Sequence, residues 1–117
     1  MPEKYRIYYY ISPSGDNPIK DFIDSLSEKQ QVKILRIFQY ISAYSLYAVL
    51  PHIKKLTGSP LWEIRILGKD NIRIIYAVPL RNTILLLHGF VKKKQKTPTG
   101  ELTIALRRHA DWIKRHR

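Results

Sequence analysis

The sequence predicts an α+β fold in the order β-α-α-β-β-β-α, in which a small antiparallel sheet packs against an N-terminal helical hairpin and a C-terminal helix. Two observations support this prediction. Apolar residues recur at helical spacing before residue 50 and alternate with polar residues after residue 60. Three strand-like segments, residues 61–67, 72–78 and 83–91, are separated by turns short enough for an antiparallel meander.

Residue type marks the N-terminal strand and the first helix. Residues 4–11 are rich in tyrosine and isoleucine, which favour a strand. Asn17 followed by Pro18 is typical of a helix start, because the asparagine side chain accepts a backbone N–H and proline has no N–H to leave unpaired. We expect this helix to end near Ser25.

A second helix is expected to follow after a very short turn. Ser27 and Gln30 form the pattern of a capping box. The helix should end near Tyr47, because Pro51 follows. Its core-facing positions are predicted to be Ile34, Leu35, Phe38 and Ile41.

The meander strands and the last helix complete the predicted fold. In the first meander strand Glu63 and Arg65 should lie on the face opposite the apolar alternate residues, which are Trp62, Ile64 and Ile66. The strand over residues 83–91 is apolar on both faces, which indicates a central position. Thr97 is the expected N-cap of the last helix, and Pro98 its first residue. The apolar stripe of that helix is predicted to contain Leu102, Leu106, His109 and Ile113.

Composition predicts one domain over residues 1–117 with a polyanionic partner. The chain has a net charge of +12 and a hydrophobic content of 44%. A basic domain of this size that can bury a core is typical of nucleic-acid binding, with a membrane surface as the second choice. Cysteine is absent, and we find neither a secretory signal nor a segment long enough to span a membrane. These features predict a cytoplasmic protein.

The positive charge is concentrated near the C-terminus. Residues 88–117 carry nine basic and two acidic residues, and therefore a net +7 of the total +12. Four lysines follow the last predicted strand, and Lys54 and Lys55 lie in the predicted loop before the first meander strand. If the sheet is curved, these groups line one electropositive groove able to hold a nucleic-acid backbone. The four lysines are Lys92, Lys93, Lys94 and Lys96.

Two arginines are predicted to face each other across the first meander hairpin. If its loop is three residues, 68–70, Arg65 lies directly opposite Arg73 on the same side of the sheet. Such a pair is tolerated more readily when an anion lies between the guanidinium groups, whose planar donors match phosphate oxygens. In the alternative interpretation Glu63 neutralises Arg65, and Arg73 points into water.

Three segments resemble the phage-derived Gp49-like, or HigB, branch of the RelE/ParE toxin superfamily. They are "KKLTGSPLWEIRI", "IRIIYAV" and "ILLLHGFVKKKQKTPTGEL", and the close match spans about residues 50–106. The only departure in the strand motif is Ile64, where leucine is usual. The resemblance implies a toxin of a type II toxin–antitoxin pair, with a RelE-like fold. It further implies a metal-independent endoribonuclease that cleaves mRNA, usually on the ribosome, and needs no cofactor. It also implies a helix-turn-helix antitoxin similar to HigA.

Metal-free RNA cleavage needs a base, an acid and cations that stabilise the charged transition state. Arg65 and Arg73 suit the stabilising role, and Lys55 or Lys93 suits the base if positive neighbours lower its pKa. Several RelE-like enzymes use a C-terminal tyrosine as the acid, but no tyrosine follows Tyr76, which is expected in the core or at an edge. His52 is the histidine best placed to act as acid or base. A protonated lysine or arginine is a further candidate for the acid, and His88 is expected to be a core histidine.

Two other functions remain open from the sequence. The first is inhibition of DNA gyrase by the same fold, as in the ParE side of the superfamily, with RNA left intact. The second is nucleic-acid binding by a phage-derived protein without catalysis. The absence of a C-terminal tyrosine is compatible with both functions, whereas the lysine segment and the arginine pair favour the ribonuclease.

Overall fold

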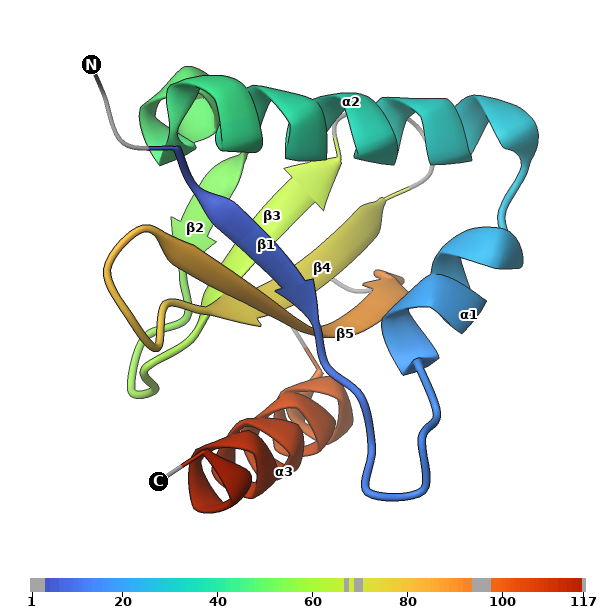
Figure 1. The fold of residues 1–117 in the computed structure, drawn as a ribbon. Coiled ribbons are helices and arrows are strands. Elements are labelled where there is room, and N and C mark those ends of the chain that lie inside the picture. The colour runs from blue at the N-terminus through green and yellow to red at the C-terminus, as the bar shows by residue number, and fades with distance from the viewer. Residues whose placement is uncertain (1–3, 67, 69–70, 94–97, 117) are drawn as a thin grey trace.

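The computed structural model describes residues 4–66, 68, 71–93 and 98–116 (Figure 1). The predictions for Leu67, Lys94, Lys96 and Thr97 therefore lie outside the described residues. The predicted α+β class is confirmed. The elements are β1 (Arg6–Tyr9), α1 (Pro18–Asp24), α2 (Glu28–Tyr44), the 3₁₀ helix η1 (Leu46–His52), β2 (Ile53–Lys55), β3 (Trp62–Ile66), β4 (Ile72–Ala77), β5 (Thr83–Val91) and α3 (Thr99–Arg115).

The sheet is mixed rather than purely antiparallel, which corrects the prediction. Its strand order is β1-β5-β4-β3-β2. β3, β4 and β5 form the predicted antiparallel meander, but β1 pairs with β5 in parallel. A parallel pair needs a long connection, and here the helices and strands between β1 and β5 supply it.

The segment containing Lys54 and Lys55 is a strand and not the predicted loop. β2 pairs antiparallel with β3, with Lys54 opposite Glu63 and Lys55 opposite Trp62. The sheet therefore has one strand more than the sequence predicted. β2 contains only three residues, too few to show a period of two.

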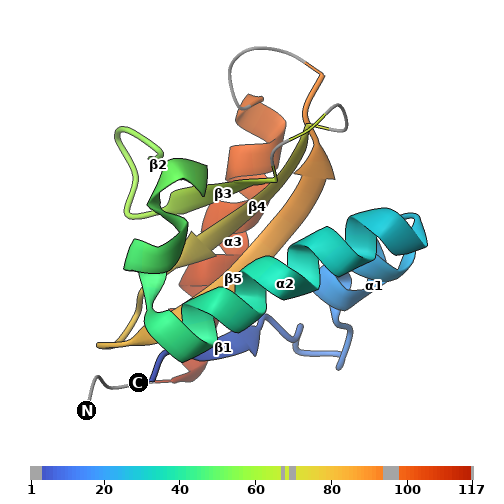
Figure 2. The same cartoon turned by 90° about the horizontal axis from the view of Figure 1, so that it is seen from above.

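The helices cover the two faces of the sheet separately. Figures 1 and 2 show α1 and α2 on one side of the sheet and α3 on the other. Gly89 allows the close approach of α1, because a Cβ at this position would overlap the ring of Phe22. The core of α2 is built on Ile34, Ile37, Phe38 and Ile41, whereas Leu35 is 46% exposed.

The predicted helix starts of the N-terminal hairpin are confirmed. The Asn17 side chain accepts from the N–H of Lys20, and Ser27 and Gln30 form a complete capping box. α2 ends at Tyr44, three residues earlier than expected, because Ser45 adopts a φ of 89° that leaves the helical region.

α3 begins at Thr99 with Pro98 as its N-cap, so Pro98 is not the first helical residue. The predicted apolar stripe is also displaced. Ala105 is the buried residue of α3, and Leu102 and Trp112 pack against the core, whereas Leu106 and Ile113 are 37% and 43% exposed. None of the helices in the described part of the chain has the length and apolar character to cross a bilayer.

Candidate nucleic-acid interface

The predicted pairing of Arg65 with Arg73 is confirmed. The two residues are direct partners in the antiparallel ladder of β3 and β4. Partners in a ladder project to the same face, and Arg73 is also opposite Phe90 of β5. Phe90 stacks on His88, which contacts α3, so both arginines lie on the α3 face of the sheet.

Glu63 holds Arg73 in place on this face. Its carboxylate is fully buried, and its Oε1 lies 3.3 Å from Nε of Arg73, whose side chain is only 13% exposed. Nη1 of Arg73 donates to the carbonyl of Ile72 at 3.1 Å. The predicted alternative paired Glu63 with Arg65 and left Arg73 in water. The structure pairs Glu63 with Arg73, whose guanidinium is fixed at the sheet surface and does not point into water.

Arg65 retains donors for an anion. Its Nη2 donates to the carbonyl of Pro51 at 3.4 Å, which anchors the tip of the side chain. Its Nε is buried and has no hydrogen-bond partner among the described residues. A buried donor without a partner costs free energy, and a bound anion would remove that cost. Nε of Arg73 also lacks a hydrogen-bond partner among the described residues, but it lies beside the Glu63 carboxylate, so Arg65 is the arginine better prepared to bind a phosphate.

His52 lies beside Arg65 at the junction of η1 and β2. Its Nδ1 is 3.1 Å from the backbone carbonyl of Arg65. Because a carbonyl only accepts, Nδ1 carries a proton, and in the neutral ring Nε2 is the basic nitrogen. His52 is half-buried, and this contact holds its ring in one orientation against the backbone of Arg65.

Lys92 completes the cluster from the end of β5. Its backbone N–H donates to the carbonyl of Asn71 at 2.8 Å, which fixes its position beside the β3–β4 hairpin. Burial lowers the pKa of its ammonium group, and the charges of three cations lower that pKa further, while Glu63 acts against them. These cations are Arg73, Lys54 and Arg65. We call Lys54, Arg65, Arg73 and Lys92, with Glu63 between them, the basic cluster.

Two other lysines of the predicted site, Lys55 and Lys93, lie outside the basic cluster. Lys55 is opposite Trp62, so it lies on the other side of β2 from Lys54, and its Nζ is 5.0 Å from the centroid of the Trp62 ring. A cation–π contact holds it there. Lys93 is exposed and follows Lys92 beyond the end of β5. The structure thus brings Arg65, Arg73, Lys54 and Lys92 together, but places Lys55 on the opposite side. His52 contacts the backbone of Arg65 rather than the cluster's side chains, and it lines a depression together with Ile66 and residues of α2.

His88 is at the centre of contacts that the sequence did not reveal. Its Nε2 contacts the Glu101 carboxylate, and its Nδ1 lies 3.2 Å from Nη1 of Arg108. Because arginine only donates, Nδ1 accepts and Nε2 carries the proton. Nη1 of Arg108 also donates to the carbonyl of Leu87 at 2.8 Å. These contacts tie β5 to α3 on both sides of the lysine segment. A histidine in an apolar strand was the only signal in the sequence.

Other groups in this region do not suit proton transfer or metal binding. Tyr76 is buried in the core, as expected, and burial raises the pKa of its hydroxyl group. Within the part of the chain that the structure describes, no three histidine or acidic side chains gather closely enough to hold a metal ion.

One family model matches the chain. Its description is phage-derived protein Gp49-like (DUF891), and the match covers residues 21–110. This range runs from α1 into α3 and includes every member of the basic cluster. A comparison with curated proteins found no match.

Proposed function

The chain belongs to the Gp49-like family of phage-derived proteins, which is of the RelE/HigB toxin type, and on this basis we propose that it is a toxin that cleaves mRNA without a metal ion. The family relates the chain to toxin–antitoxin systems. The observation that carries the proposal is the basic cluster, above all the two arginines that face each other on the α3 face of the sheet.

A phosphodiester is the ligand that this cluster fits best. Lys54, Arg65, Arg73 and Lys92 contribute four cations, and Glu63 offsets one of them, so the cluster retains a positive charge. A phosphate between the two guanidinium groups would relieve their repulsion and occupy the unpartnered Nε of Arg65. The same groups would stabilise the additional negative charge of the transition state.

The proposed reaction transfers the phosphorus from one ribose oxygen to another. A base removes the proton of the 2′-hydroxyl, the 2′-oxygen bonds to phosphorus, and the bond from phosphorus to the 5′-oxygen breaks. An acid then protonates the 5′-oxygen. The products are a 2′,3′-cyclic phosphate and a 5′-hydroxyl, so that atoms and protons balance without a co-reactant.

Lys92 is the lysine best suited to act as the base. Its pKa is lowered by burial and by the neighbouring cations, which raises the neutral fraction that can accept a proton. It therefore takes the role that sequence reasoning gave to Lys55 or Lys93. His52, held beside Arg65, is suited to protonate the leaving 5′-oxygen.

The proposal includes the partners that such a toxin requires. We propose that a helix-turn-helix antitoxin similar to HigA binds the chain, and that an acidic or amphipathic segment of that antitoxin covers the basic cluster. The mRNA is proposed to be cleaved on the ribosome in the cytoplasm. Lys54 and Lys92 supply attraction to the RNA backbone, because lysine is a less directional phosphate partner than arginine.

Sequencing of RNA 5′ ends after induced expression in bacteria tests the activity. The wild-type chain should generate new internal 5′-hydroxyl ends, and Arg65→Ala should reduce them by about 100-fold or more. Arg107→Ala removes an exposed arginine of α3 outside the cluster and should cleave like the wild type. Intact transcripts together with DNA breaks would favour gyrase inhibition. Intact transcripts without growth arrest would favour nucleic-acid binding alone.

A further inference from the structure

β1 forms one edge of the sheet, and its outer side carries backbone groups that no strand pairs. The N–H of Arg6 donates to Asn82 at 2.8 Å and that of Tyr10 to Leu86 at 2.9 Å. Because backbone groups alternate along a strand, those of Ile7 and Tyr9 point away from β5. No described residue pairs with them, and Figure 2 shows β1 at the margin of the molecule.

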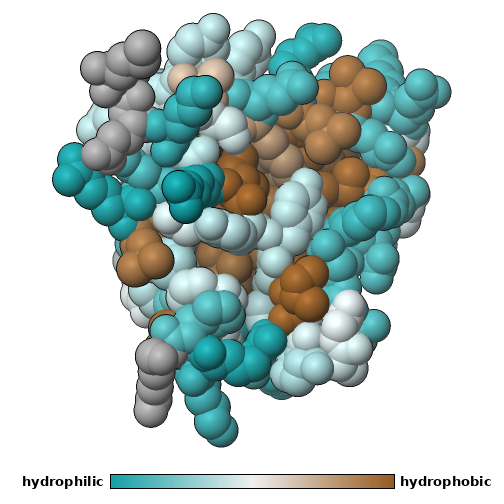
Figure 3. All heavy atoms as spheres, in the orientation of Figure 1, coloured by the Kyte–Doolittle hydropathy of each residue, from teal (hydrophilic) through white to brown (hydrophobic). Residues whose placement is uncertain are grey.

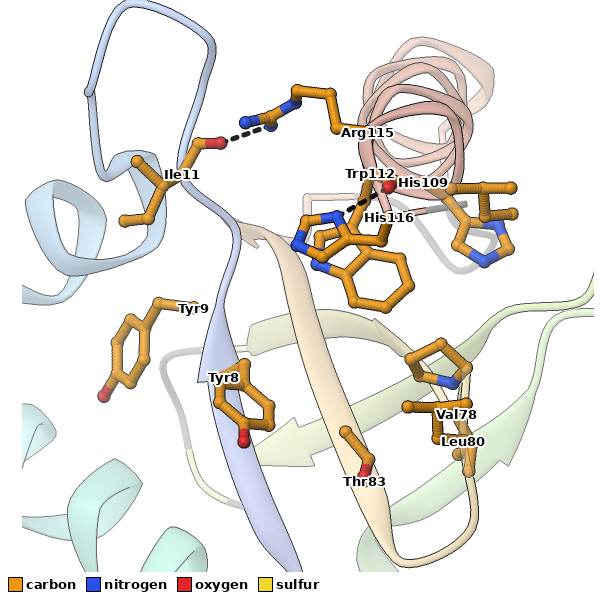
Figure 4. A pocket seen from close by; sticks show the side chains of 12 residues that line it. Tyr8, Tyr9, Ile11, Val78, Leu80, Thr83, His109, Trp112, Arg115 and His116 are labelled. Atoms are coloured by element: carbon orange, nitrogen blue, oxygen red, sulfur yellow. Dashed lines mark hydrogen bonds between the residues drawn. The ribbon is translucent and has the colours of Figure 1, made fainter.

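A large apolar depression borders β1 on the α3 side of the sheet. Its volume is about 950 Å³, and it lies between β1, the turn after β4 and the C-terminal half of α3. Figure 4 shows Tyr8 on the same side of β1 as Trp112 and Leu80. Tyr8, Leu80 and Ile113 are 47%, 65% and 43% exposed. The depression thus contains Ile113, a member of the apolar stripe that the sequence predicted for the last helix.

A smaller apolar depression borders β1 on the α2 side. It has a volume of about 280 Å³ and is lined mainly by Ile7, Tyr9, Leu35 and Phe38. Tyr9 meets the ring of Phe38 edge-on, with centroids 6.2 Å apart. In Figure 3 apolar atoms gather below α2 with hydrophilic atoms around them. Both sides of this edge strand therefore offer apolar surface next to unpaired backbone.

We propose that an extended segment of a protein partner adds to the outer edge of β1. Its backbone would pair with Ile7 and Tyr9. Successive residues of a strand point to opposite faces, so its side chains would enter the larger and the smaller depression in turn. RNA or a small apolar ligand could fill a depression but could not satisfy the backbone groups between them.

The charge of the chain favours an acidic partner over a second copy. The net charge is +12, and Lys4 and Arg6 are exposed at the start of β1. A second copy would bring another chain of the same net positive charge to this edge, and the two chains would repel each other. The partner segment should therefore carry apolar residues at successive positions, which enter the two depressions in turn, and Asp or Glu on either side of them.

This inference rests on the part of the proposed function that gives the chain a protein partner. β5 and β4 separate β1 from β3, which carries Arg65, so the edge and the basic cluster are different surfaces. A partner on β1 would leave the cluster open and would need a second segment to block it. Binding at β1 is thus testable without any measurement of RNA cleavage.

The test selects binders from a library of 12-residue peptides displayed against the folded chain. We expect enrichment of peptides with a run of apolar residues between acidic flanks. Tyr8→Glu should weaken their binding at least about tenfold, or about 1.4 kcal/mol, because it places a negative charge in the larger depression. Leu50→Glu serves as the matched control, since Leu50 is 55% exposed on η1, outside both depressions.

Amide hydrogen exchange identifies the binding mode. With a selected peptide bound, the amides of Ile7 and Tyr9 should become protected about tenfold or more, whereas Arg6 and Tyr10 should already be protected in the free chain. Unchanged exchange at Ile7 and Tyr9, or failure to enrich any peptide, would overturn the proposal. So would a dimer of the free chain, by sedimentation, that Tyr8→Glu disrupts, because a second copy would then cover the edge.

Discussion

At the scale of single residues, Arg65 and Arg73 look equivalent in the sequence but not in the structure. Both face the same side, as the alternation of β3 and β4 and the length of their turn predicted. The carboxylate that neutralises Arg73 could not be assigned in advance. Glu63 precedes Arg65 by two residues in the same strand, and only the cross-strand geometry brings it to Arg73. Burial of Glu63 was likewise invisible, because alternation alone places it on a polar face.

The difference predicts separate effects on stability. Arg73→Ala removes an ion-pair partner of a fully buried carboxylate and should lower the free energy of unfolding by about 3 kcal/mol. Arg65→Ala removes a side chain whose one hydrogen bond is long, and should lower it by less than about 1 kcal/mol. Urea denaturation of both variants measures this. Equal losses would show that Glu63 does not depend on Arg73, and Arg65→Ala is the cleaner variant for testing cleavage.

At the scale of elements, the sequence correctly predicted the features that depend on residues close together in the chain. The cap at Asn17 and the capping box at Ser27 lie within a few residues of the helices that they start. The parallel pairing of β1 depends instead on contacts far along the chain, and β2 exists because β3 is beside it. The unpredicted strand β2 affects the site, because Lys54 and Lys55 project to opposite sides of it.

The contact between β5 and α3 predicts a dependence of stability on pH. Burial lowers the pKa of His88 below its ordinary 6.5, although Glu101 acts in the opposite direction, and Arg108 donates to the neutral ring. The unfolded chain therefore takes up a proton at a higher pH than the folded chain. The free energy of unfolding should fall as the pH drops below about 6.5, by at most about 1.4 kcal/mol per pH unit for this residue.

Chemical denaturation between about pH 7 and pH 5 measures this slope. His88→Gln should make it shallower. His116→Gln is the control, because His116 is exposed after the end of α3 and its hydrogen bond is to the Trp112 carbonyl rather than to Glu101 or Arg108. An unchanged slope in His88→Gln would mean that His88 is not the group responsible.

At the scale of the whole molecule, the sheet separates two kinds of surface. β2, β3, β4 and the end of β5 carry the basic cluster, and β1 at the opposite edge borders the apolar depressions. The sequence revealed the excess charge and its concentration near the C-terminus. It could not reveal the exposed apolar surface, because the residues that form it have the spacing of core residues. Tertiary packing decides which side of α3 is buried, and it leaves Ile113 exposed.

This separation predicts that charge in the cluster, rather than net charge alone, governs RNA binding. Affinity for a single-stranded RNA with 2′-O-methyl groups, which prevent cleavage, should fall as salt rises, because each phosphate contact releases counterions. Lys92→Gln should reduce the slope of log affinity against log salt by about 0.7, the value for one contact with a single strand. Lys29→Gln removes the same net charge from an exposed position on α2 and should leave the slope unchanged. Equal reductions in the two variants would show that the RNA responds only to the total charge.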